Sequence, residues 1–103
     1  MNEPKIEVNE DGSIAIIGEL DHQSIPALLK KSSGIFFSDH NRNSDDLNID
    51  LKAVSRSDSA GVALLIEWMR QAKKNHKTIR FDNIPEQMRE LAEVSGVDKL
   101  LAM

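Results

Sequence analysis

The fold is constrained most by an alternation between short apolar runs of strand length and longer segments with helical spacing. Residues 6–9 alternate between apolar and polar side chains and lead into Glu10-Asp11-Gly12, which is a strong hairpin-turn signal. Residues 13–18 are apolar nearly throughout, which suits a strand covered on both faces. The start of the chain therefore predicts a β-hairpin whose second strand lies deeper than its first.

The next segment has the spacing of a helix. Apolar residues recur at helical intervals from Ile25 onward, and Ser24 ahead of Pro26 is typical of a helix N-cap. We expect Gly34 to interrupt this helix or to end its first part. Residues 38–46 are all polar and have no periodicity, which predicts a surface loop. Carboxylates in this loop suit a cation, but a solvated loop is the favoured interpretation because EF-hand spacing is missing.

The second half of the chain continues the alternation. Residues 47–51 predict a short strand, residues 52–58 a polar connection, and residues 78–81 a further strand. Between them, a long helix is expected to begin around Ser59. Its core-facing stripe consists of Ala60, Leu64, Leu65, Trp68, Met69 and Ala72.

The last predicted helix opens at residues 83–85, with Leu91 and Val94 facing inward, and Gly96 ends it. Residues 97–101 predict a final short helical turn. The predicted order is therefore β-β-α-β-α-β-α-α, which implies right-handed crossovers and a small, mostly parallel sheet carrying one antiparallel hairpin strand. The fold class is α/β with helices packed on the sheet, in a single domain spanning residues 1–103.

Composition excludes several functional classes. The 103 residues carry 13 Lys plus Arg against 17 Asp plus Glu, a net charge of −4, which argues against a nucleic-acid partner. The absence of cysteine excludes disulfides, thiol catalysis and Cys-based metal sites. No apolar run reaches the ~18–20 residues needed to span a bilayer, and the N-terminus does not resemble a signal peptide. We therefore expect a cytoplasmic protein without cofactors or direct membrane insertion.

The most informative local pattern lies where the long helix begins. Asp58 and Ser59 fall where unpaired N–H groups and the positive end of the helix dipole gather. Either residue suits a simple capping role. Alternatively, Ser59 is a phosphorylation or partner-contact position, and helical spacing puts Val62 and Ile66 on the same flank, beside the core stripe. The two aliphatic residues are then either spare surface hydrophobes or the centre of a docking face.

Three separated segments carry a family resemblance that extends over nearly the whole chain. Gly18-Glu19-Leu20-Asp21, Ile49-Asp50-Leu51 and Asp58-Ser59-Ala60-Gly61 resemble STAS domains, in which these segments frame the junction between a strand and the second helix. The closest resemblance is to the STAS subunits of phospholipid-transporting ABC complexes, which maintain outer-membrane lipid asymmetry. The resemblance implies the STAS fold and a non-catalytic binding module.

The resemblance also implies a partner and a contact surface. Transporter-type members bind the ATPase subunit, and through it the permease, on the cytoplasmic face of the inner membrane. Ser59 falls where they carry a contacting Thr, and where anti-sigma factor antagonists carry a phosphorylatable Ser. The expected partner-binding residues are Asp58, Ser59, Gly61, Val62 and Ile66. The alternative function is an anti-sigma factor antagonist regulated by phosphorylation at Ser59.

Catalysis by the chain alone has little support from its residues. Ser59 lacks the G-x-S-x-G elbow of a hydrolase nucleophile, and the three histidines show no pairing that the sequence can support. A basic cluster follows the long helix, made of Arg70, Lys73, Lys74, Lys77 and Arg80. These cations suit the negative end of the helix dipole, and an acidic partner or lipid headgroups are the alternative ligands.

Overall fold

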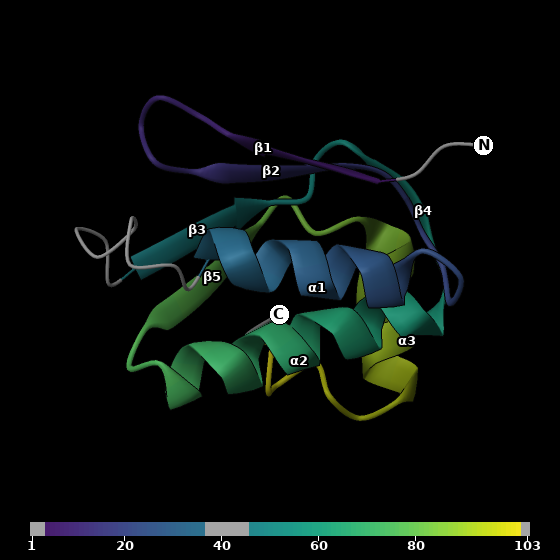
Figure 1. Cartoon of the computed structure of the whole chain (residues 1–103). Helices are drawn as coiled ribbons and strands as arrows, with labels where there is room; N and C mark the ends of the chain where they lie inside the picture. The colour runs from purple at the N-terminus through teal and green to yellow at the C-terminus, as the bar shows by residue number, and fades with distance from the viewer. Residues whose placement is uncertain (1–3, 37–45, 102–103) are drawn as a thin grey trace.

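The computed structural model describes residues 4–36 and 46–101, and five strands and three helices lie within them (Figure 1). The elements in chain order are β1 (Lys5–Val8), β2 (Ile14–Leu20), α1 (Ile25–Phe36), β3 (Asp46–Asp50), β4 (Val54–Ser57), α2 (Ser59–Lys74), β5 (Thr78–Asp82) and α3 (Glu86–Val94). The predicted loop at residues 38–46 lies outside the described residues, apart from its last residue at the start of β3.

The sheet confirms the predicted topology. β1 pairs antiparallel with β2, while β2–β3, β2–β4 and β3–β5 are parallel. The hairpin turn closes where the N–H of Gly12 donates to the carbonyl of Asn9 at 3.0 Å. As predicted, β2 is more buried than β1. The predicted α/β class with one antiparallel hairpin strand is therefore confirmed.

Strand β4 was not predicted, because its segment reads as a polar connection. Strand β2 pairs with β3 through its first residues and with β4 through its last, and the pairing register shifts between Gly18 and Glu19. The N–H of Gly18 donates to the carbonyl of Ala53 at 3.0 Å across this shift. Strands β3 and β4 thus lie end to end along the same edge of β2, and this arrangement carries the chain directly to the start of α2.

Two further predictions are wrong at element boundaries. Helix α1 continues through Gly34 to Phe36, so the glycine does not break it. The predicted final turn is present, since the N–H of Leu101 donates to the carbonyl of Val97 at 3.2 Å, but it does not form the additional helix that the predicted order contains. Helix α3 ends where predicted, next to Gly96, whose positive φ of 75° suits a residue without a side chain.

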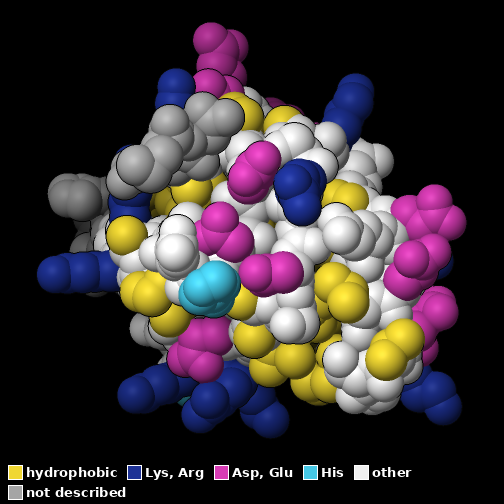
Figure 2. Space-filling view, turned by 90° about the vertical axis from the view of Figure 1, so that its right-hand side faces the viewer, with side chains coloured by type: hydrophobic (Ala, Val, Ile, Leu, Met, Phe, Trp, Pro, Cys, Tyr) yellow, Lys and Arg dark blue, Asp and Glu magenta, His cyan; other side chains and the backbone are white. Residues whose placement is uncertain are grey.

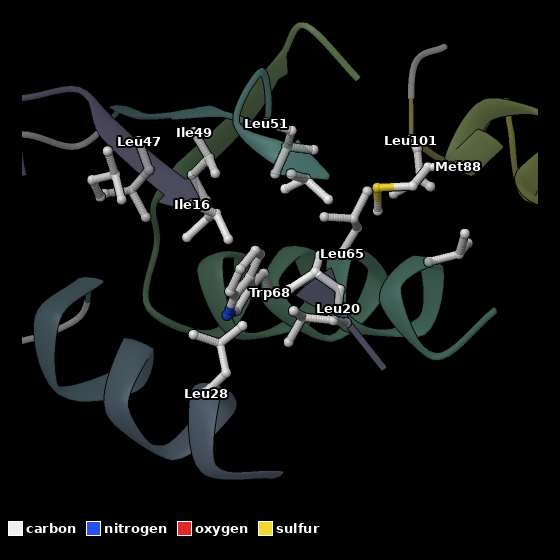
Figure 3. Packing of buried hydrophobic residues seen from close by; sticks show 14 of the residues in the cluster. Ile16, Leu20, Leu28, Leu47, Ile49, Leu51, Leu65, Trp68, Met88 and Leu101 are labelled. Carbon is white, nitrogen blue, oxygen red and sulfur yellow. The ribbon is translucent and has the colours of Figure 1, made fainter. Parts of the chain in front are cut away.

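The core is built around Trp68, as its place in the apolar stripe predicts. Trp68 is fully buried, and its indole N–H donates to the hydroxyl of buried Ser32 at 2.7 Å. The ring of Phe36 lies 5.2 Å from the Trp68 ring, within the range of favourable aromatic pairs. Figure 3 shows Trp68 of α2 between Leu28 on α1 and the side chains that project from the sheet. Because the donor and acceptor satisfy each other, the polar pair is compatible with burial.

The helices position the start of α2 at one end of the molecule. Helix α2 packs against α1 and β5, and α3 packs against both α2 and β4 (Figure 1). The beginning of α2 therefore meets the ends of β2 and β4 and the side of α3 in one place.

In the part of the chain that the structure describes, no helix combines the length and apolar character that crossing a membrane requires.

Candidate functional site

Helix α2 begins with a side-chain cap, which confirms the capping interpretation for Asp58. The backbone of Asp58 is extended, and its Oδ1 accepts a hydrogen bond from the N–H of Ala60 at 2.8 Å. The N–H of Asp58 donates to the carbonyl of Leu20 at 3.2 Å, which fixes the cap against the end of β2. This bond pattern satisfies a helix donor that would otherwise be free.

Ser59 is the first residue of α2, and its side chain is exposed. Since Asp58 caps the helix, the Ser59 hydroxyl is not needed for that task. Within the described residues, no protein group forms a hydrogen bond with this hydroxyl. Ser59 therefore offers a free donor and acceptor at the positive end of the helix dipole.

A hollow of about 470 Å³ opens beside Ser59, and we call it the Ser59 hollow. The ends of β2 and β4, the start of α2 and one side of α3 contribute to it. Its lining residues are Glu19, Leu20, Asp21, Arg56, Ser57, Asp58, Ser59, Gln87 and Leu91. Figure 2 looks onto this end of the molecule and shows acidic side chains gathered around a histidine, with hydrophobic side chains beside them.

The charge of the Ser59 hollow is mainly negative. Glu19, Asp21 and Asp58 contribute carboxylates to its lining, against the single guanidinium of Arg56. Backbone N–H groups hold the Asp21 carboxylate, since its Oδ1 accepts from Ser24 at 2.8 Å and from Gln23 at 3.0 Å. These bonds, the one from Ser24 above all, hold the pKa of Asp21 below its usual range. Asp21 is therefore charged throughout the neutral range.

His22 joins this group through a long-range contact that the sequence does not reveal. Its Nδ1 lies 3.8 Å from Oδ2 of Asp58, although the two residues are 36 positions apart in the sequence. Both side chains are substantially exposed, at 78% and 46%. The pairing brings the turn that precedes α1 next to the cap of α2. In residues 4–36 and 46–101, no cluster of histidines and carboxylates has the arrangement of a metal site.

Gly61 is buried beneath the hollow, where it allows α2 to approach β4 closely. A Cβ atom at Gly61 would lie 1.9 Å from Oγ of Ser57 and 3.3 Å from Cβ of Leu20. Ser57 is only 5% exposed, and its hydroxyl donates to the carbonyl of Asp58 at 3.0 Å. Only glycine fits against this buried serine, so the structure gives Gly61 a packing role.

The predicted flank of α2 is more buried than expected. Val62 is only 4% exposed and belongs to the core, so its predicted position beside the core stripe is wrong. Ile66 is half-buried and packs against the core. Helix α3 packs against α2, which widens the buried face of α2 beyond the predicted stripe. Of the predicted partner-binding residues, the structure brings Asp58 and Ser59 together at the surface of the hollow.

Other residues of the hollow were not predicted as site residues. Gln87 reaches it from α3, and its Oε1 accepts a hydrogen bond from the N–H of Ser57 at 3.3 Å. Glu19 lies in the predicted family segment at the end of β2, so that segment did contain a signal. Arg56 belongs to the unpredicted strand β4, and its place beside Ser59 follows from pairing with β2.

The basic cluster lies at the opposite end of α2. A second hollow of about 490 Å³ is lined there by Glu67, Arg70, Gln71, Lys73 and Lys74. Arg70 pairs with Glu67 at 3.2 Å, and Arg80 pairs with Asp82 at 3.1 Å. Lys73 and Lys74 lie in the last turn of α2, where cations complement the helix dipole.

The structure thus defines an α/β domain with a polar hollow at the start of its second helix. The chain belongs to the STAS domain family, because the family model described as "Mlab, STAS domain" matches residues 7–102. The predicted resemblance is thereby confirmed.

Two characterised relatives differ in function. The anti-sigma-B factor antagonist of Bacillus subtilis is 29% identical over 100 residues, covering 97% of this chain and 82% of that protein. The intermembrane phospholipid transport system binding protein MlaB of Haemophilus influenzae is 27% identical over 94 residues, covering 91% and 89%.

Solved structures of the anti-sigma factor antagonist SpoIIAA have the same fold. The unphosphorylated form matches with a TM-score of 0.69 and 22% identity, covering 93% of this chain and 83% of that one. The phosphorylated form matches with a TM-score of 0.64 and 24% identity, covering 93% and 86%. The SpoIIAA-like fold of this chain is therefore clear.

Proposed function

We propose that this protein is the non-catalytic STAS subunit of an Mla-type ABC complex that transports phospholipid and maintains outer-membrane lipid asymmetry. It binds the MlaF-like ATPase subunit, and through it the permease, at the cytoplasmic face of the inner membrane. The observation that carries the proposal is the exposed Ser59 hydroxyl, which has no partner among the described residues and stands at the edge of the Ser59 hollow. The relation to MlaB supports the choice of partner.

The geometry suits docking better than chemistry on a substrate. The hollow offers a hydroxyl, carboxylates and a guanidinium at the surface, and α2 is fixed beneath them by the cap at Asp58 and the close contact at Gly61. A rigid surface loses little conformational freedom when a partner binds. Binding one state of the ATPase more tightly than another then shifts the ATPase toward that state.

A second candidate is an anti-sigma factor antagonist that is switched by phosphorylation at Ser59. The relation to the Bacillus subtilis antagonist favours it. A phosphate on Ser59 adds about 1.5 to 2 negative charges next to the helix N-terminus, where the dipole stabilises them. The nearby carboxylates of Glu19 and Asp58 make the docking surface much more negative once phosphate is added. Phosphorylation would thus change the surface while leaving the fold intact.

The experiment that tests the proposal is an affinity capture from the native membranes and from the soluble fraction of the source cells, followed by mass spectrometry. Tagged wild-type protein is compared with Ser59→Asp, which replaces the hydroxyl donor at the edge of the hollow by a carboxylate that can only accept hydrogen bonds. Ser55→Asp serves as a matched control, since Ser55 is also exposed but lies outside the lining of the hollow. Thermal melting of all three proteins checks that the fold is retained, since surface changes usually alter stability by less than about 0.5 kcal/mol.

The proposal expects the wild type and Ser55→Asp to retain an ABC ATPase and its permease, and Ser59→Asp to lose both. Recovery of a soluble kinase with phosphate on Ser59 would support the switch instead. Equal recovery of the transporter by all three proteins would show that the partner binds elsewhere on the molecule.

A further inference from the structure

Helix α3 exposes an apolar side chain that its sequence pattern assigns to the core. Val94 is 88% exposed, and the prediction that it faces inward is wrong. The inward residues of α3 are instead Met88 and Ala92, both fully buried. Leu91 is half-buried and contributes to the lining of the Ser59 hollow. Val94 follows Leu91 by three positions, so the two residues are neighbours on one side of the helix.

These two residues continue the Ser59 hollow along α3, and we call them the α3 strip. Gln87 lies one turn before Leu91 and also lines the hollow, so Gln87, Leu91 and Val94 follow one another along the same side of the helix. The hydrogen bond from the N–H of Ser57 to Gln87 ties α3 to β4. The strip is therefore held at a fixed position relative to Ser59.

The charges around the α3 strip indicate what binds there. Glu90 is exposed and lies one turn before Val94. The hollow beside the strip carries the three carboxylates described above against the single guanidinium of Arg56, so its charge is negative overall. An apolar side chain flanked by lysine or arginine complements this combination. A second copy of this chain does not, because a symmetric contact would bring the two acidic surfaces together.

We infer that the α3 strip is the second half of the docking surface, and that the ATPase subunit covers it with an apolar side chain flanked by basic residues. This inference rests on the proposed function and adds the location and chemistry of a second contact. Covering Val94 removes a large exposed apolar side chain from water, which favours association. The acidic surroundings attract the basic flank and speed the encounter of the two proteins.

The test measures binding of the purified Mla-type ATPase subunit to the full chain by surface plasmon resonance. Val94→Asp is the principal variant, and Val8→Asp is its matched control. Val8 is 55% exposed and lies opposite Ile14, at the other end of β2 from the hollow. We expect Val94→Asp to weaken affinity by about tenfold or more, as the loss of a central interface contact does, and Val8→Asp to leave it unchanged.

Ser59→Asp separates failure of this inference from failure of the proposed function. If Ser59→Asp abolishes binding while Val94→Asp binds like the wild type, the α3 strip is not part of the interface and the inference is overturned. If the wild type itself does not bind the ATPase, the proposed function falls. A weakening by Val8→Asp equal to that by Val94→Asp would also overturn the inference, because it would reveal a general effect of added charge.

A charge reversal tests the basic flank separately. Glu90→Lys changes the sign of an exposed side chain beside Val94. We expect slower association at low salt and a difference from the wild type that shrinks as salt is added, because salt screens exposed charges. Faster association would show that the partner is acidic at this position and would overturn the proposed basic flank.

Discussion

The two ends of helix α2 are held by different contacts. At the first end, Asp58 caps the helix, its N–H bonds to the carbonyl of Leu20 in β2, and Gly61 packs against buried Ser57 in β4. At the last end, the helix closes locally, as the side chain of Asn75 donates to the carbonyl of Gln71 at 2.7 Å. The first end is therefore tied to the ends of two strands. The last end is closed by its own turn and tied to α1, since the hydroxyl of Ser33 donates to Oε1 of Gln71 at 2.9 Å.

The two ends of α2 also differ in the charge of the side chains around them. Carboxylates surround the first end of α2, while Lys73 and Lys74 occupy the last turn beside the second hollow. Changes at the first end should therefore affect folding and docking together. Changes at the last end should have small effects on stability and none on docking.

The largest expected effect comes from Gly61→Ala. The added methyl group collides with Ser57 and Leu20, and overpacking of this kind costs about 1–3 kcal/mol of unfolding free energy. Urea unfolding measures the loss. Adding Ser57→Gly removes the nearest contacts, so the double variant should lose less than the sum of the two single losses. Wild-type stability of Gly61→Ala would show that α2 can move away from β4 freely.

A smaller effect is expected from Asp58→Ala, which removes the cap. The expected loss is about 0.5–2 kcal/mol, and Asp58→Asn should restore most of it, because asparagine also caps helices. Asn75→Ala provides the comparison at the other end of α2. We expect Asp58→Ala to weaken binding of the ATPase as well, while Asn75→Ala leaves binding unchanged. If Asp58→Ala and Asn75→Ala bind the ATPase equally well, the docking surface does not depend on the cap at the first end of α2.

Lys73→Ala and Lys74→Ala test the basic end. Each lysine contributes about 0.3–1 kcal/mol with the helix dipole at low ionic strength, and salt should remove this contribution. Melting temperatures in low and high salt provide the measurement. Neither change should alter binding of the ATPase. A loss of binding would move the docking surface to the basic end of α2.

The smallest effect concerns pH, because the Asp21 carboxylate is accessible to solvent. Its pKa lies below the usual value in the folded protein, so its contribution to stability is present above about pH 4, the ordinary aspartate range, and is lost as pH falls through the folded pKa. Melting curves of wild type and Asp21→Asn between pH 5 and 2.5 should converge as the pH falls. Parallel curves would show that the bonds from Ser24 and Gln23 do not stabilise the charged form.

Much of the fold follows from local patterns in the sequence. The turn at Glu10-Asp11-Gly12 and the strand at residues 78–81 are confirmed, because each carries a strong local signal. The start of α2 at Ser59 is also confirmed, since a polar connection gives way there to an apolar stripe. These elements depend on neighbours in the sequence, so a local pattern can predict them.

The missed features depend on contacts that sequence spacing does not contain. Strand β4 reads as polar because Ser57 is one of its two buried residues, and its pairing with β2 sets its place. Val62 is buried because α2 also packs against α3. Val94 is exposed because the buried side of α3 runs through Met88 and Ala92. Of the residues that line the Ser59 hollow, the sequence singled out Asp58 and Ser59, while the tertiary fold brings the others to it.

Trp68 is the only tryptophan of the chain, and its burial makes it a reporter of the interior. Its indole is shielded from water, bonded to Ser32 and close to Phe36, so its fluorescence changes when the core opens. It lies about 14 Å along the helix axis from Ser59, at a rise of about 1.5 Å per residue. A variant that loses its partner but keeps the wild-type emission spectrum thus has a damaged surface over an intact interior.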